Sequence, residues 1–82
     1  MREFFVAFRS RSDAVRFYEE VITYRLPARV VNTPSSAGVG CGLSVKMLMK
    51  NLGQARAVLE RMRTDSVIGF FGIGANGAVR RL

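Results

Sequence analysis

The run Glu3–Phe8 near the start of the chain constrains the fold more than any other stretch. Its sequence, EFFVAF, is rich in aromatic and β-branched residues, which favour a strand. Side chains alternate between the two faces of a strand, and apolar residues occupy both alternating sets here. A strand that is apolar on both sides is typical of the middle of a sheet. We therefore expect this run to form a central strand.

Two amphipathic helices are predicted. Ser10 and Asp13 have the spacing of an N-terminal capping pattern, and Pro27 is expected to close the helix that they begin. Asn51 can cap the second helix. Apolar residues recur at helical spacing in both segments. In the first they are Ala14, Phe17, Tyr18, Val21 and Ile22, and in the second Leu52, Ala55, Val58, Leu59 and Met62.

Three further strands are expected, over residues 28–32, 43–49 and 67–73. The resulting order, β-α-β-β-α-β, is that of a two-layer ferredoxin-like sandwich of the α+β class. Right-handed crossovers would place both helices on one face of a four-stranded antiparallel sheet in the order 4-1-3-2. The alternative is another two-layer α+β arrangement of the same elements. We expect residues 1–74 to form one domain and residues 75–82 to form a flexible basic tail.

The composition narrows the possible chemistry. The chain of 82 residues has no histidine and only six acidic residues, which disfavours zinc sites, histidine-based triads and carboxylate cages. We therefore expect no metal and no cofactor. One cysteine cannot form an internal disulfide, so a reducing cytoplasm is the expected location. No apolar run approaches the roughly 20 residues of a membrane span, so no membrane association is expected. The net charge of +7 favours anionic partners.

Covalent chemistry is plausible at one place, the loop PSSAGVGCG over residues 34–42. Cys41 lies there between Gly40 and Gly42, at the mouth of a strand. The predicted topology brings this loop to the sheet edge where the first helix begins and the second ends. Cations, bare backbone N–H groups and a helix N-terminus favour a thiolate over a thiol. The expected supporting cations are Arg9, Arg11, Arg61 and Arg63.

The alternative for Cys41 is a small inert residue that fills space at the start of a strand. Glycines on either side favour the reactive interpretation, because they leave backbone N–H groups free and let a partner approach closely. No histidine is available to activate it. From the residues alone both roles of Cys41 stay open, and a nucleophilic thiol here would depend on surrounding positive charge for its activation.

Several short motifs follow one another along the chain in a particular order. They are a strand ending at Phe8, a helix start at Asp13-Ala14, Pro34 in the loop, and Cys41-Gly42-Leu43 followed by the basic Lys46. Over about residues 3 to 73, this layout resembles a small bacterial family of selenium/sulfur carrier-like proteins. The resemblance implies that Cys41 accepts a sulfur or selenium atom from one protein and passes it to another. With one cysteine, the chain would be a link in a relay rather than a self-contained enzyme.

Two other functions fit the same fold. RNA-recognition modules of this topology stack bases on sheet aromatics, and Phe5 with Phe70 or Phe71 could do so. We expect these rings to lie in a core or an interface instead, because the run LSVKMLM lacks the aromatic pattern of those modules. A homodimeric interaction domain is the other possibility. It would bury Phe5, Ala7 and Leu48 on the sheet face that the helices leave open.

Overall fold

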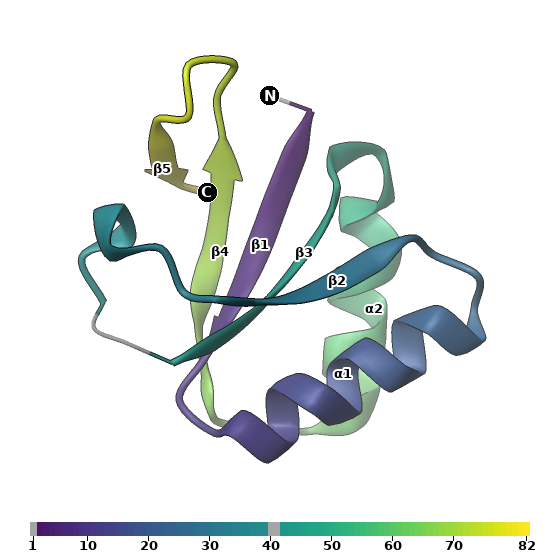
Figure 1. Ribbon diagram of the computed structural model, residues 1–82. Coiled ribbons are helices and arrows are strands. Elements are labelled where there is room, and N and C mark those ends of the chain that lie inside the picture. The colour runs from purple at the N-terminus through teal and green to yellow at the C-terminus, as the bar shows by residue number, and fades with distance from the viewer. Residues whose placement is uncertain (1, 40–41) are drawn as a thin grey trace.

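A computed structural model describes residues 2–39 and 42–82 of the chain. Its elements follow the order β-α-β-β-α-β-β (Figure 1). The strands are β1 (Glu3–Phe8), β2 (Ala28–Asn32), β3 (Leu43–Leu48), β4 (Val67–Ile73) and β5 (Val79–Arg81). The helices are α1 (Arg11–Thr23) and α2 (Leu52–Met62), with single 3-10 turns η1 (Ser35–Ala37) and η2 (Met49–Asn51).

The five strands form one antiparallel sheet in the order β2-β3-β1-β4-β5. Both helices cover the same face of this sheet (Figure 1). The α+β class, the ferredoxin-like arrangement and the 4-1-3-2 order of the first four strands are therefore confirmed. Within the described residues, no helix combines the length and the apolar character needed to cross a membrane.

The carboxy-terminal segment differs from the predicted loose tail. Residues 79–81 pair with β4 and become the fifth strand, at the sheet edge. The connecting turn is well defined: the Gly74 N–H donates to the Ala78 carbonyl at 2.8 Å, and Gly77 has a φ of 84°. A left-handed backbone of this kind favours glycine. A three-residue strand has too little apolar alternation to be recognised in the sequence, which explains the missed element.

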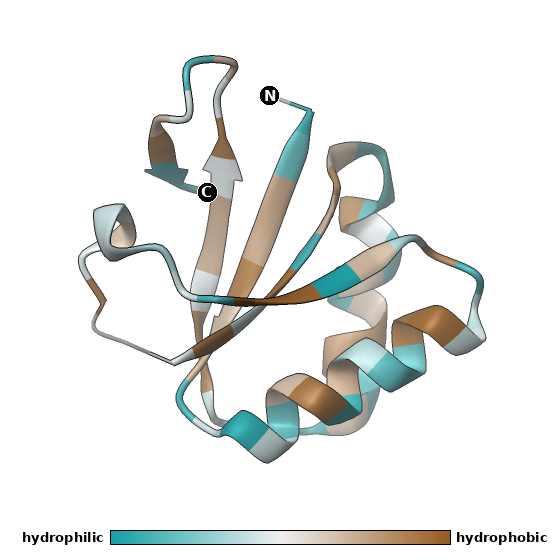
Figure 2. Ribbon diagram, viewed as in Figure 1, coloured by the Kyte–Doolittle hydropathy of each residue, from teal (hydrophilic) through white to brown (hydrophobic). Residues whose placement is uncertain are grey.

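The central strand β1 is buried on both faces, as predicted. Phe4, Val6 and Phe8 pack beneath the helices, while Phe5 and Ala7 belong to a second cluster on the opposite face. Each of these five side chains is at most 1% exposed. The apolar character of β1 after Glu3 is visible in Figure 2. The molecule therefore has two apolar cores, one on each side of the sheet.

The helix starts agree only in part with the predicted caps. Ser10 caps α1, because its hydroxyl accepts the Asp13 N–H at 3.1 Å. Asn51 precedes α2 but makes no side-chain capping bond, because the 3-10 turn η2 leads directly into the helix. The end of α1 at Thr23 comes before Pro27, with Arg25 in the left-handed region at a φ of 62°.

Asp13 ties the start of α1 to the turn that precedes β4. Its carboxylate accepts hydrogen bonds from the hydroxyls of Thr64 and Ser66, and it pairs with Arg16 at 3.1 Å. The Thr64 and Ser66 hydrogen bonds hold the pKa of Asp13 below its ordinary value of 3.8. Burial acts in the opposite direction, and the charge of Arg16 adds to the lowering. The ionised carboxylate is thus part of the folded structure.

Replacing Asp13→Asn should lower the Tm at pH 7, because the amide cannot accept both hydroxyl bonds with the strength of a carboxylate. The pKa of Asp13 is lower in the folded chain, so its contribution is present above about pH 4 and is lost as the pH falls through the lowered pKa. The Tm difference between the wild type and the variant should therefore shrink below pH 4 in thermal melts.

Asp65→Asn is the matched control, because Asp65 is exposed and offers Arg9 its backbone carbonyl rather than its carboxylate. If the control variant loses as much stability at pH 7 as Asp13→Asn does, the Asp13 carboxylate does not have the stabilising role given to it here. A Tm difference for Asp13→Asn that stays constant down to pH 2 would contradict that role as well.

Candidate functional site

The centre of the predicted site, Gly40 and Cys41, lies outside the described residues. The loop is described up to Val39 and again from Gly42. The surroundings of the loop are the two strands that it connects, β2 and β3, and the sheet surface against which its first half packs.

The base of the loop is closed by the β2–β3 ladder. Beyond the end of β2, the Thr33 N–H donates to the Gly42 carbonyl at 2.9 Å. The hydroxyls of Thr33 and Ser44 share a hydrogen bond of 2.7 Å, and both residues are buried. Each hydroxyl thus satisfies the other in a place where an unpaired polar group would be costly. The two ends of the loop are fixed relative to each other.

Gly42 allows the loop base to approach β1 closely. A Cβ atom at this position would lie 3.0 Å from the Phe8 carbonyl oxygen, which belongs to the backbone of the central strand. Phe8 pairs with Leu43 in the sheet, so neither strand can move aside easily. Packing therefore favours glycine at position 42, whatever the role of the cysteine.

The first half of the loop folds over the sheet face that carries no helix. Ala37 and Val39 pack there against Phe5, Ala7 and Phe71. The η1 turn lies on this side of the sheet, near β5 (Figure 1). Within residues 34–39, Ala37 and Val39 are therefore half-buried against the second core, while Ser35, Ser36 and Gly38 are exposed.

This packing buries aromatic rings that the nucleic-acid alternative required to be exposed. Phe5 is 1% exposed and Phe71 is 3% exposed, and the two rings stack on each other at 5.2 Å. Phe70 lies on the helix side, with the Arg56 guanidinium 4.5 Å above its ring. A nucleic-acid stacking platform needs exposed rings. Of the three residues predicted to form a dimer face, Phe5 and Ala7 are buried and Leu48 is half-buried, so the homodimer stays a prediction.

Three of the four predicted cations lie at the expected end of the sheet. Arg9 follows β1 directly, and its main chain and guanidinium donate to the carbonyls of Ser66 and Asp65, both at 2.7 Å. Arg63 ends α2 one residue before Thr64, with a φ of 54°. Arg11 is the exposed first residue of α1. Three arginines therefore lie where β1 leads into α1 and α2 leads into β4, in the same region as the carboxylates of Asp13 and Asp65.

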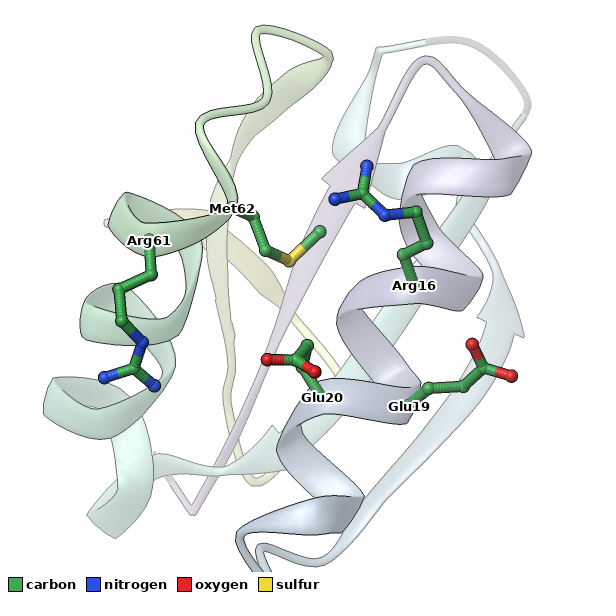
Figure 3. A pocket seen from close by; sticks show the side chains of 5 residues that line it. All are labelled: Arg16, Glu19, Glu20, Arg61 and Met62. Carbon is green, nitrogen blue, oxygen red and sulfur yellow. The ribbon is translucent and has the colours of Figure 1, made fainter.

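Arg61 points elsewhere. Its guanidinium lies 5.0 Å above the ring of Tyr24, at the far end of α1. Figure 3 shows Arg61 among the side chains around a hollow between the two helices. The volume of this hollow is about 270 Å³. The side chains around this hollow are Arg16, Glu19, Glu20, Arg61 and Met62. They mix both charges and include no nucleophile, and the described residues contain no cluster of metal-ligating side chains.

One cation on the loop side of the sheet was not predicted. The Arg81 guanidinium lies 5.3 Å above the Phe71 ring and donates to the Ile68 carbonyl at 2.8 Å. Gly69 makes room for it, because a Cβ atom there would lie 2.9 Å from the guanidinium. The only signal in the sequence is the alternation of Val79 and Arg81 opposite a glycine-containing strand.

Residues 3–66 match the family model described as "Putative Se/S carrier protein-like". The chain belongs to this family. The matched span runs from β1 through α2, so it contains the whole loop with Cys41 and ends before β4. No curated protein and no solved structure matches the chain. The family membership agrees with the resemblance on which the sequence prediction rested.

Replacing Gly42→Ala should destabilise the protein by about 1–3 kcal/mol, the usual range for overpacking, because the new methyl group would press on the Phe8 carbonyl. Gly53→Ala is the matched control. It lies in α2 with open space around the new methyl group, so it should raise stability by up to about 1 kcal/mol. Urea unfolding measures both changes. Equal effects of the two variants would contradict the close approach at Gly42.

Proposed function

We propose that this protein is a sulfur or selenium carrier in which Cys41 holds the transferred atom. One observation carries the proposal: the family match over residues 3–66 spans the only cysteine of the chain. This chain has no other thiol with which to bind the atom covalently. The proposed partners are two proteins, a donor and an acceptor, each presenting its own thiol or persulfide.

The transfer balances without an external oxidant or reductant. The Cys41 thiolate attacks the outer sulfur of a donor persulfide, forming a new S–S bond, while the donor S–S bond breaks and the donor thiolate leaves. In the second step an acceptor thiolate attacks the same outer sulfur, and the Cys41 thiolate leaves. Each step forms one S–S bond and breaks one. With selenium as cargo, the outer atom is selenium and the bonding changes are the same.

The described surroundings of the loop support this chemistry. The ends of the loop are held by the Thr33–Gly42 hydrogen bond and by the packing of Gly42 on β1. Arg9, Arg11 and Arg63 add positive charge at the edge of the sheet to which Phe8 and Gly42 belong. Positive charge favours both the attacking thiolate and the anionic persulfide that it becomes. The net charge of +7 favours acidic donor and acceptor proteins.

The test is to load the protein with a cysteine desulfurase and free cysteine, followed by intact mass spectrometry without reductant. We expect an added mass of about 32 Da, one sulfur atom, which dithiothreitol removes. Cys41→Ser should gain no mass. The sharper control is a synthetic peptide of residues 34–46, which carries the same thiol without the fold.

The folded protein should load at least about tenfold faster than this peptide, because the fold supplies the charge and the loop geometry. Loading of the protein that is absent, or no faster than that of the peptide, would reject the carrier role.

A further inference from the structure

The second apolar core of this protein is covered in part by the carboxy-terminal hairpin, residues 74–82, in which the chain turns after β4 and returns as β5. Both helices lie on the other face of the sheet, yet Phe5, Ala7 and Phe71 are at most 3% exposed. The side chains that cover them come from the loop, from β4 and from the hairpin of residues 74–82, which contributes Val79. Ala37 and Val39 belong to the loop, and Ile68, Ile73 and Val79 belong to β4 and β5. The loop and the hairpin therefore share one apolar contact surface.

Arg81 fastens the hairpin to the sheet. β5 has only three residues, so its hydrogen-bond ladder with β4 is short. The Arg81 guanidinium adds a hydrogen bond to the Ile68 carbonyl and a cation–π contact with Phe71. Gly69 leaves the space that the guanidinium occupies. The Leu82 N–H adds one more bond, to the Phe70 carbonyl at 2.9 Å.

The loop itself has little of its own to hold it on the sheet. Its η1 turn contains two backbone bonds, from Ala37 to the Pro34 carbonyl at 3.1 Å and from Gly38 to the Ser35 carbonyl at 3.0 Å. A single 3-10 turn is not stable by itself. The η1 turn is in contact with β5. Removing the hairpin would thus remove one wall of the site on which Ala37 and Val39 pack.

The family match ends at residue 66, so β4 and β5 lie beyond it. We infer that the hairpin of residues 74–82 positions the loop that carries Cys41, and that Arg81 is its positioning residue. This inference rests on the proposed carrier function for its consequence: releasing the described part of the loop, residues 35–39, would slow the loading of Cys41. Arg81 acts through Phe71 and the loop and takes no part in the transfer itself.

Hydrogen exchange on the full chain tests the inference. In Arg81→Ala, the amides of Ala37 and Gly38 should exchange at least about tenfold faster, because the loop opens locally once its neighbour is released. Amides of β1 and α1 should keep the wild-type rate, which shows that the fold is intact. Arg81→Lys retains a donor for the Ile68 carbonyl and should give an intermediate rate.

Arg80→Ala is the matched control. It removes the same charge from the neighbouring position of β5, on the opposite face, and should leave the loop amides unchanged. Loop exchange in Arg81→Ala within twofold of the wild type would overturn the inference. Should Arg81→Ala fail to fold, Arg81→Lys against Arg80→Ala decides the question by the same readout.

The rate of persulfide loading shows whether Arg81 positions the loop for transfer or only stabilises the fold. Loading of Arg81→Ala should be at least about fivefold slower than that of Arg80→Ala, because catalysis by orientation is lost when the loop is released. Faster loop exchange with unchanged loading would mean that the hairpin only stabilises the fold, and it would overturn the positioning role. A wild-type protein that takes up no sulfur would reject the carrier function, while loop exchange would still decide whether the hairpin holds the loop.

Discussion

The structure depends on a central strand that is apolar on both of its faces. The helices can cover only one face, because right-handed crossovers place both of them on the same side. On the other face, Phe5 and Ala7 have to be covered by whatever chain remains. Burying a phenylalanine is worth about 1.5–3 kcal/mol, a large fraction of the stability of so small a domain. The loop after β2 and the hairpin after β4 supply this cover.

This constraint changes the character of the candidate site. A loop rich in glycine and serine is ordinarily mobile and costs entropy when a partner orders it. Here its first half is packed on Phe5 and Phe71, and its base is closed by the Thr33–Gly42 bond. A relay protein that meets two partners in turn gains from a prearranged loop, because less ordering remains to be done in each encounter. Both the packing of the second core and the proposed function thus favour a loop whose first half is held on the sheet.

The elements of the fold could be predicted from the sequence because their patterns are local. The runs of β1, β2 and β4 have the predicted bounds, and the Ser10–Asp13 spacing gives a real cap. What the sequence could not give were contacts between distant segments. Arg61 has the right place on α2, but its side chain turns to Tyr24. Arg81 was predicted to lie in a flexible tail. Its contacts with Phe71 and the Ile68 carbonyl depend on the pairing of β5 with β4, which the local sequence pattern does not reveal.

The most direct test of this account is a solution NMR measurement of contacts across the second core. The methyl groups of Val39 and Ala37 should show nuclear Overhauser effects to the rings of Phe5 and Phe71, with chemical shifts moved by the ring currents of the stacked pair. Random-coil shifts for Val39 and Ala37, without contacts to either ring, would show that the loop lies free of the sheet. The account of a packed loop held by the hairpin would then be wrong.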